Sequence, residues 1–435
     1  MRATAHRTAA PLPLDSVDVA IVGAGPAGLA AADAAAGSGA RIALLDDNPA
    51  PGGQIWRDGP GVQLPAAARQ LRARVAGHAG VQVITGVRVL AAPAPDELLL
   101  EDAGRAWRLR WRRLILATGA RELLLPFPGW TLPGVTGAGG LQALVKAGLP
   151  VAGERIVVAG SGPLLLAAAA TARRAGARVL RVAEQAPAGA VARFALGLPH
   201  WPSKAWQVLG LRQPGYRAGS WVIAAEGDGR LAAVRLHRPG GREERIACDR
   251  LACGFGLVPN VELGRLLGCA TVPVHGAPAL AVDGWQATSR PGIHAAGECT
   301  GVGGSERAGV QGAIAGHAAV GQTAQAQTLR QALAHWDAFA ARLHRGFALR
   351  DALRGLAAPD TLLCRCEDVP MAALAGCSGW TDAKLQTRCG MGACQGRVCG
   401  AAARVLFGWE PPAPRPPLVP ARVETLAGLD AGGPD

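Results

Sequence analysis

Several features are scarce or missing in this chain of 435 residues. No run of eighteen apolar residues occurs, so no membrane span is predicted. Residues 1–16 include two arginines but no apolar stretch before a cleavage site, which argues against a secretory leader. Aromatic residues make up 4% of the chain and form no stacking platform, so the net charge of +13 does not indicate nucleic-acid binding. We expect a cytoplasmic protein that reaches the inner membrane only through partners.

What the chain does contain is typical of a globular α/β protein. Its composition is 49% hydrophobic and 18% charged, and its length allows two or three domains with ample cores. Ten cysteines are present, and six of them follow residue 360. In a reducing compartment such cysteines are free to bind metal.

A nucleotide-binding loop opens the chain. The segment Val17-Asp-Val-Ala-Ile-Val-Gly23-Ala-Gly25-Pro-Ala-Gly28 reads as a buried strand entering a glycine loop. An alanine-rich helix and a second strand, residues 41–46, follow it and complete a βαβ unit that ends in Asp46. Gly23 permits a tight turn, Gly25 admits a pyrophosphate and Gly28 allows close helix-strand packing. Asp46 is placed to accept hydrogen bonds from an adenosine ribose.

A second copy of this pattern is less complete. Residues 154–165 again join a strand to an alanine-rich helix, with Gly160 and Gly162 in the loop and Leu165 where the third glycine would stand. The next strand, residues 178–184, ends in Glu184. A bulky residue at position 165 should weaken the close packing of helix on strand. The site could bind NAD(H), could bind another nucleotide or could be a structural vestige, and Glu184 would favour a free 2′-hydroxyl.

Three further segments resemble the two-dinucleotide-binding-domain flavoproteins. They are Leu114-Ile-Leu-Ala-Thr118-Gly119-Ala120, Gly254-Phe-Gly-Leu-Val-Pro-Asn260 and Gly292-Ile-His-Ala-Ala-Gly297-Glu298. The resemblance implies FAD in the first fold, a domain crossing at Thr118-Gly119 and contacts of Gly297 and Glu298 with the ribityl chain and phosphate. Glu298 replaces the aspartate of that family. A helix from about residue 309 to 319 would direct its N-terminal dipole at the flavin pyrimidine edge.

The resemblance implies a set of cofactor residues in each fold. In the first fold they are Gly23, Gly25, Pro26, Ala27, Gly28, Asp46, Gly53, Gln54, Thr118, Gly119, Gly297 and Glu298; in the second they are Gly160, Gly162 and Glu184. The disulfide reductases of this superfamily carry a reactive cysteine after the glycine pair, where this chain has Gln54. A redox disulfide is therefore not expected, and we interpret Cys248, Cys253, Cys269 and Cys299 as buried packing residues.

The C-terminal cysteines form a pattern suited to a soft metal. Cys364-Arg-Cys366-Glu is followed by Arg-Cys389-Gly-Met-Gly-Ala-Cys394-Gln-Gly-Arg-Val-Cys399-Gly. Predicted helices start after Cys366 and at Cys399, so their N-termini would face an anionic cluster. This favours Cys364, Cys366, Cys394 and Cys399 as ligands of a [2Fe-2S] cluster, with Cys389 as a spare or as the alternative to Cys394. Zinc or unliganded thiols stay open, and Cys377 is read as packing.

The tail resembles the bacterioferritin-associated-ferredoxin-like [2Fe-2S] module. Together with the two folds, it makes nearly the whole chain similar to the larger flavoprotein subunit of the opine oxidase, hydroxyproline or proline dehydrogenase and hydrogen cyanide synthase group. That resemblance implies a subunit that relays electrons from amine, imino acid or opine oxidation to an external acceptor. The partners implied are a flavoprotein subunit similar to D-amino-acid or glycine oxidases and a small ferredoxin-like subunit. No catalytic acid or base is assigned.

The expected organisation is α/β, with two nested Rossmann-like domains and a small, mainly helical cysteine domain. The predicted units are a discontinuous FAD-binding domain (15–125 and 259–325), a degenerate nucleotide-binding domain (126–258), a helical connector (326–358), a [2Fe-2S]-binding domain (359–408) and a proline-rich tail (409–435). Two other functions remain possible: a stand-alone NAD(P)H-dependent reductase, and a scaffolding subunit with an inactive flavin.

Overall fold

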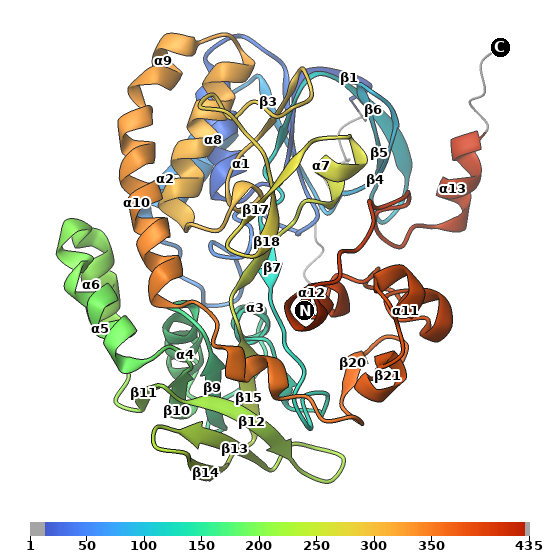
Figure 1. Ribbon diagram of the computed structural model, residues 1–435. Helices are drawn as coiled ribbons and strands as arrows, with labels where there is room; N and C mark the ends of the chain where they lie inside the picture. Colours follow the sequence, from blue (N-terminus) through green and yellow to red (C-terminus); the bar gives the residue numbers. More distant parts are fainter. Residues whose placement is uncertain (1–13, 431–435) are drawn as a thin grey trace, which may run out of the picture.

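The computed structural model describes residues 14–430 and confirms the predicted α/β class (Figure 1). Residues 1–13, where we expected no secretory leader, lie outside the described range. The first sheet has the order β3 (Val81–Thr85), β2 (Ile42–Asp46), β1 (Ser16–Val22), β6 (Ala106–Leu116), β5 (Glu97–Glu101) and β4 (Arg88–Ala94), and β19 (Ile293–Ala295) also pairs with β6. Strands β1, β2, β3, β6 and β19 are parallel, whereas β4, β5 and β6 form an antiparallel edge.

Two helices pack closely beside this sheet because both carry small residues. Helix α1 (Pro26–Ala36) follows the first glycine loop, and α8 (Ser305–Ala319) comes from the far end of the sequence. A Cβ atom at Gly312 would lie 2.0 Å from the carbonyl oxygen of Ala27, and one at Gly316 would lie 2.3 Å from that of Ala31. The glycines therefore let α8 approach α1 and hold its N-terminus near the glycine loop.

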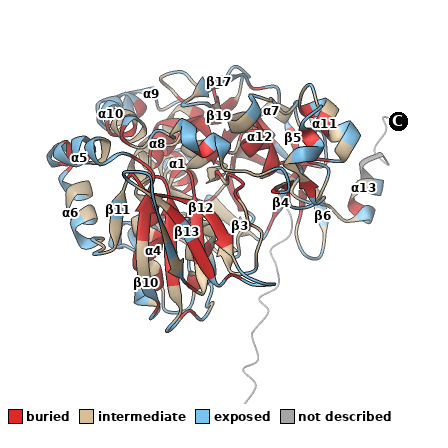
Figure 2. Ribbon diagram, turned by 60° about the horizontal axis from the view of Figure 1, so that its bottom comes forward, coloured by how far each residue is buried: buried red, intermediate tan, exposed pale blue. Residues whose placement is uncertain are grey.

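The second sheet is built from the repeated pattern. Its parallel strands have the order β11 (Tyr216–Ala218), β10 (Arg178–Glu184), β9 (Arg155–Gly160), β15 (Arg250–Gly254) and β8 (Val135–Thr136). It is accompanied by helices α3 (Ala138–Lys146) and α4 (Leu164–Arg174), and by the antiparallel strands β12 (Trp221–Glu226), β13 (Ala233–Arg238) and β14 (Arg242–Ala247). A hairpin of α5 (Ala188–Leu196) and α6 (Pro202–Gly210) separates β10 from β11 and lies at the edge of the molecule (Figures 1 and 2).

The chain crosses between the two folds twice, and the crossings pair with each other. Strand β7 (Ala120–Glu122) runs antiparallel to β16 (Leu257–Pro259). Asn260 fixes the start of this ladder, since its backbone N–H donates to Gly119 and its side-chain amide donates to the carbonyl of Thr118. The Thr118 hydroxyl in turn donates to the Asn260 carbonyl.

The C-terminal part packs on both folds. Helices α9 (Thr323–Thr328) and α10 (Arg330–Gly346) contact α8 of the first fold, and α10 also contacts α5 of the second. The cysteine domain follows, with β20 (Leu362–Cys364), β21 (Val369–Pro370), α11 (Trp380–Thr387) and α12 (Cys399–Phe407). Side chains of this part and of the second fold belong to one continuous apolar core, in which Leu363 and Trp380 join Phe127 and Val222. The indole N–H of Trp130 donates to the carbonyl of Leu362 at 2.7 Å.

The helix that we predicted after Cys366 is wrong. Asp368 has a left-handed φ of 49°, so the chain turns back there and Val369 pairs with Cys364. Only a short 3₁₀ turn, Met371–Leu374, follows. The helix predicted at Cys399 is present as α12.

The proline-rich segment runs over the first fold. The N–H of Leu418 donates to the carbonyl of Leu90 in β4 at 2.8 Å. The segment ends in a helix that we did not predict, α13 (Val423–Asp430). Within residues 14–430, no helix has both the length and the apolar character needed to cross a membrane.

Candidate functional site

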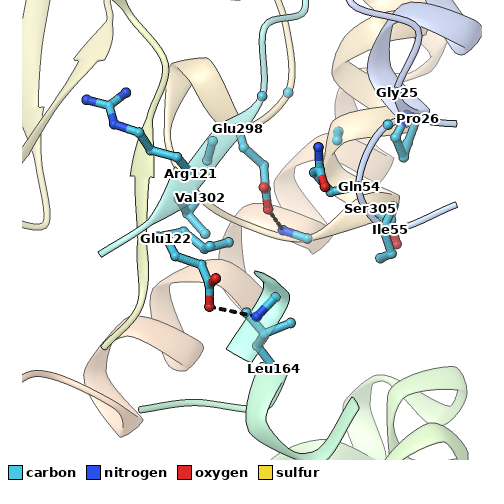
Figure 3. Close-up of a pocket in the computed structure, with 18 of the residues that line it drawn as sticks. Gly25, Pro26, Gln54, Ile55, Arg121, Glu122, Leu164, Glu298, Val302 and Ser305 are labelled. Carbon is cyan, nitrogen blue, oxygen red and sulfur yellow. Dashed lines mark hydrogen bonds between the residues drawn. The ribbon is translucent and has the colours of Figure 1, made fainter. Parts of the chain in front are cut away.

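A cleft of about 2810 Å³ lies between the two folds and the cysteine domain. The predicted FAD residues that line it are Gly23, Gly25, Pro26, Ala27, Asp46, Gly53, Gln54, Thr118, Gly119, Gly297 and Glu298. Figure 3 shows Gly25, Pro26 and Gln54 on one side and Arg121, Glu122 and Glu298 across from them. Segments from distant parts of the sequence thus meet around one space large enough for a dinucleotide.

The first glycine loop has the close contacts that its sequence requires. A Cβ at Gly28 would lie 1.7 Å from the carbonyl oxygen of Gly23, so only glycine lets α1 meet β1 there. Gly23 has a φ of 105°, and a Cβ on it would lie 2.2 Å from the carbonyl oxygen of Ala117. Gly53 approaches from the following loop, since its Cβ would be 3.0 Å from the Cα of Gly25. The loop therefore exposes bare backbone toward the cleft.

Asp46 is held rigidly at the end of β2. Its Oδ2 accepts the backbone N–H of Ala24 at 2.6 Å, and its Oδ1 accepts the backbone and side-chain N–H groups of Asn48 at 2.8 and 2.7 Å. The side chain is 5% exposed but still lines the cleft. Because a carboxylate has about four acceptor positions, Asp46 keeps capacity for a ribose hydroxyl.

The segment around Glu298 joins the cleft to α8. Helix α8 begins at Ser305, one turn before the predicted start, and residues of its first turn line the cleft. The N–H of Gly297 donates to Gln311 at 3.0 Å, and Glu298 Oε1 accepts the N–H of Gly304 at 3.3 Å. Burial raises the pKa of Glu298.

Glu122 is a second carboxyl group of the cleft, and sequence reasoning missed it. Its two oxygens accept the N–H groups of Gly139 and Gly140, at the first turn of α3, at 2.7 and 2.9 Å. Burial nevertheless raises its pKa. Burial thus raises the pKa of two carboxyl groups that line the same cleft, Glu122 and Glu298.

Two histidines also line the cleft without any local sequence signal. The rings of His275 and His344 stack with their centroids 3.6 Å apart, and Nε2 of His344 lies 2.7 Å from the carbonyl oxygen of Val302. Burial lowers the pKa of both rings. Because the two residues come from separate elements, only the folded chain reveals the pair.

The second glycine loop is folded as a nucleotide loop but is more enclosed. A Cβ at Gly160 would lie 1.8 Å from the carbonyl oxygen of Gly254. Of the three residues predicted here, only Gly162 lines the cleft. Glu184 is fully buried, with its oxygens accepting the N–H groups of Gly162 and Ala186 at 2.7 and 2.8 Å. Burial raises its pKa to about 7.

The C-terminal cysteines converge at one place. The Sγ atoms of Cys364, Cys389 and Cys399 all lie within 4.8 Å of one another. Cys394 makes thiol contacts with both Cys399 and Cys366. Of the four predicted ligands, Cys364 and Cys399 thus belong to a three-thiol group whose third member is Cys389, and Cys394 links Cys366 to Cys399 beside it.

Glycines let the loop between Cys389 and Cys399 close around this group. A Cβ at Gly392 would lie 2.2 Å from the Cβ of Cys366, and one at Gly390 would lie 2.4 Å from the Trp380 ring. Hydrogen bonds from the Cys399 thiol and the backbone lower the pKa of Cys394. Such a donor set of clustered thiols suits an iron-sulfur centre or another soft metal.

The remaining cysteines occupy other positions. Cys248, Cys253, Cys269 and Cys299 are all buried, as predicted for packing residues. Cys377 is only partly buried and packs at the edge of the shared core.

One arginine connects the cleft with the cysteine group. Arg121 lines the cleft, and its Nε donates to the carbonyl of Arg397, which lies between Cys394 and Cys399, at 3.1 Å. The same guanidinium donates to Asn260 Oδ1 at 2.8 Å and pairs with Glu262 at 2.9 Å. Arg397 also lines the cleft. The cysteine loop is therefore fixed directly to the domain crossing.

Comparison with known proteins agrees with this architecture. The model of the pyridine nucleotide-disulphide oxidoreductase family matches residues 17–328. The chain is 34% identical to hydrogen cyanide synthase subunit HcnB of Pseudomonas aeruginosa, an alignment that covers 87% of this chain and 90% of HcnB. It is 35% identical to an opine oxidase subunit of Rhizobium meliloti, with 88% of this chain and 90% of that protein covered.

Among solved structures, the fold resembles L-proline dehydrogenase from P. horikoshii. The TM-score is 0.69 at 19% identity, with 94% of this chain and 79% of that chain covered. The chain thus belongs to the pyridine nucleotide-disulphide oxidoreductase family, as an FAD-dependent oxidoreductase related to HcnB of hydrogen cyanide synthase and to a subunit of opine oxidase.

Proposed function

We propose that this chain is the electron-relay subunit of an amine-oxidising complex. It would carry electrons from a partner flavoprotein, through FAD in the first fold and a [2Fe-2S] cluster in the cysteine domain, to an external acceptor. The observation that carries the proposal is the meeting of two sites: five cysteines gather around a loop that Arg121 fixes to the wall of the FAD cleft. The names of two relatives, which belong to hydrogen cyanide synthase and opine oxidase, support the substrate class.

FAD would be held by the first fold's own groups. The bare backbone of Gly25 and Gly53 leaves room for a pyrophosphate, and Asp46 is oriented to accept a ribose hydroxyl. The first turn of α8 would face the flavin with its backbone N–H groups, which favour negative charge. When bound, FAD supplies two-electron redox chemistry. Glu122 and Glu298 would hold or release the accompanying protons within the cleft.

The cluster would be bound by Cys364, Cys366, Cys394 and Cys399. Cys364 and Cys399 already lie within 4.8 Å, and Cys394 contacts the thiols of Cys399 and Cys366. Cys389 is the alternative to Cys394, because its Sγ lies within 4.8 Å of those of Cys364 and Cys399. A cluster held here would pass electrons singly. The proposed partner is a substrate-oxidising flavoprotein subunit, with or without a small ferredoxin-like subunit.

Anaerobic reduction separates this function from its alternatives. With a candidate amino acid, imino acid or opine, the isolated chain should keep its oxidised flavin spectrum. The same substrates should reduce its flavin once the amine-oxidising partner is added. Reduction of the isolated chain by an amine would contradict the assignment of substrate oxidation to a separate subunit. If neither centre is reduced with the partner present, the chain is a scaffold, and direct reduction by NADH would identify a stand-alone reductase.

A further inference from the structure

The two dinucleotide folds of this chain differ at one functional place, the end of their second strand. In the first fold, Asp46, Asp47 and Asn48 stand at the end of β2, and all three line the cleft. In the second fold, the matching residues at the end of β10 are Glu184 and Gln185, which are both 0% exposed. This is the place where an acidic residue accepts the adenosine ribose of a bound dinucleotide. This strand end is open to the cleft in the first fold and covered in the second.

A segment of the same chain covers the end of β10. The segment 347–350, which follows α10, crosses the end of β10 and is called here the strap. The Ser161 hydroxyl donates to the carbonyl of Phe347 at 3.0 Å. The Gln185 side-chain amide donates to the carbonyl of Ala348 at 3.0 Å, and its oxygen accepts the N–H of Arg350 at 3.1 Å. Gln185 also donates to Ser161 at 3.0 Å, so loop, strand end and strap form one network.

Contacts at both ends keep the strap in place. The ring of Phe347 packs edge-on against Phe194, with centroids 5.1 Å apart. The guanidinium of Arg350 lies over the ring of Trp221 at 4.9 Å. The carboxylate of Glu184 beneath it is already bonded to two backbone N–H groups and has no exposed surface for a ribose. Displacing the strap would remove the bond of Ser161 to Phe347 and the two bonds of Gln185 to Ala348 and Arg350, leaving only the bond between Gln185 and Ser161, which is unfavourable.

We propose that the strap fills the adenosine end of the second nucleotide site and thereby excludes pyridine nucleotides. Ser161 and Gln185 then act as specificity-determining residues, because the flavin is denied NADH and NADPH as electron donors and stays available to a protein donor. The strap also leads toward the cysteine domain: Leu353 is buried in the core shared with that domain, and Arg354 donates to the carbonyl of Val405 in α12 at 2.7 Å. The strand end that would otherwise accept a ribose would thus help to hold the cysteine domain in place.

Nucleotide binding to the full-length, flavin-loaded chain tests the exclusion directly. Anaerobic addition of NADH or NADPH should leave the flavin spectrum unchanged, and equilibrium dialysis with labelled NADH should give no Kd below about 1 mM. Tighter binding, accompanied by faster amide exchange in residues 347–350, would overturn the proposal. This outcome does not depend on the iron-sulfur assignment, since iron content is measured separately.

A variant tests the contact itself. In Gln185→Ala, the amide of Arg350 loses its acceptor, so its hydrogen-exchange rate should rise about tenfold or more. The control is Gln142→Ala, which removes a side chain bonded to Thr171 in the same fold at 3.0 Å and should leave the strap protected. Unchanged exchange at Arg350 in a folded Gln185→Ala protein would overturn the proposal that Gln185 holds the strap in place. If that variant fails to fold, the dialysis result on the unaltered chain still decides.

Discussion

Arg121 Nε and the carbonyl oxygen of Arg397 are joined by a hydrogen bond of 3.1 Å. The donor lies on the strand that crosses from the first fold to the second, and the acceptor lies in the loop between two candidate metal ligands. Both residues line the cleft in which we propose that FAD binds. A single side chain therefore connects the two proposed redox sites.

Replacement of Arg121 should loosen this connection. Arg121→Lys cannot reach Arg397, Asn260 and Glu262 together, because an ammonium lacks the planar fork of a guanidinium. We expect a loss of about 2 kcal/mol in the free energy of unfolding, measured with denaturant. Arg41→Lys alters a pair with Asp18 whose arginine is 63% exposed, and it should change stability little. Equal effects of the two substitutions would contradict the structural role of Arg121.

Gly28→Ala should impair the first fold and its FAD content. Its Cβ would meet the Gly23 carbonyl oxygen at 1.7 Å, so α1 must move away from the loop. We expect a destabilisation of about 1–3 kcal/mol and several-fold less bound flavin per chain, measured by absorbance after acid release. Gly37→Ala, at the other end of the same helix, meets no atom within 4 Å and should keep its flavin. Full flavin content in Gly28→Ala would refute the close-packing argument.

Substitution shows whether Cys394 or Cys389 is the fourth ligand of the cluster. Cys394 contacts both Cys399 and Cys366, so Cys394→Ser should abolish most iron binding. With Cys394 as the ligand, Cys389→Ser should retain iron, even though the Cys389 Sγ lies within 4.8 Å of those of Cys364 and Cys399. Cys377→Ser, outside this three-thiol group, is the control. Iron and acid-labile sulfide per chain are the measurements. The opposite pattern, with iron lost only in Cys389→Ser, would assign Cys389 as the ligand instead.

Acid should release the C-terminal helix before the rest of the fold. The buried Glu101 carboxylate accepts hydrogen bonds from Thr425 at 2.7 Å and from the Arg422 N–H at 3.0 Å. Burial alone would raise its pKa, but these bonds lower it below 4.5. The pKa of Glu101 is thus lower in the folded state than in the unfolded chain. The stability that this carboxylate contributes is therefore present above pH 4.5 and is lost as the pH falls through the folded-state pKa.

Hydrogen exchange of α13 as a function of pH, corrected for intrinsic rates, measures this release. Thr425→Val should loosen α13 already at neutral pH, because the carboxylate loses a donor. Glu424→Gln alters a neighbouring side chain that is 74% exposed and should have little effect. Protection that stays constant with pH, or that is equal in both variants, would exclude Glu101 as the anchor.

The sequence was informative where the determinants are local. Strand, glycine loop, helix and terminal acid follow one another within about 30 residues, so the first fold and Asp46 could be predicted. The Arg121 to Arg397 contact spans 276 positions, and the Gln185 contact with the strap spans 163, so neither leaves a local pattern. The helix after Cys366 was mispredicted because acidic residues followed by a proline are typical of a turn as well as of a helix start. In the structure, the left-handed backbone of Asp368 makes the turn.

One polypeptide should hold both a flavin and a diiron site. Anaerobically purified chain, assayed for flavin, iron and acid-labile sulfide and examined by electron paramagnetic resonance after reduction, tests it most directly. We expect about one FAD, two irons and two sulfides per chain, with a signal of a reduced [2Fe-2S] cluster. A preparation with only the yellow of flavin, and with neither iron nor sulfide, would contradict it.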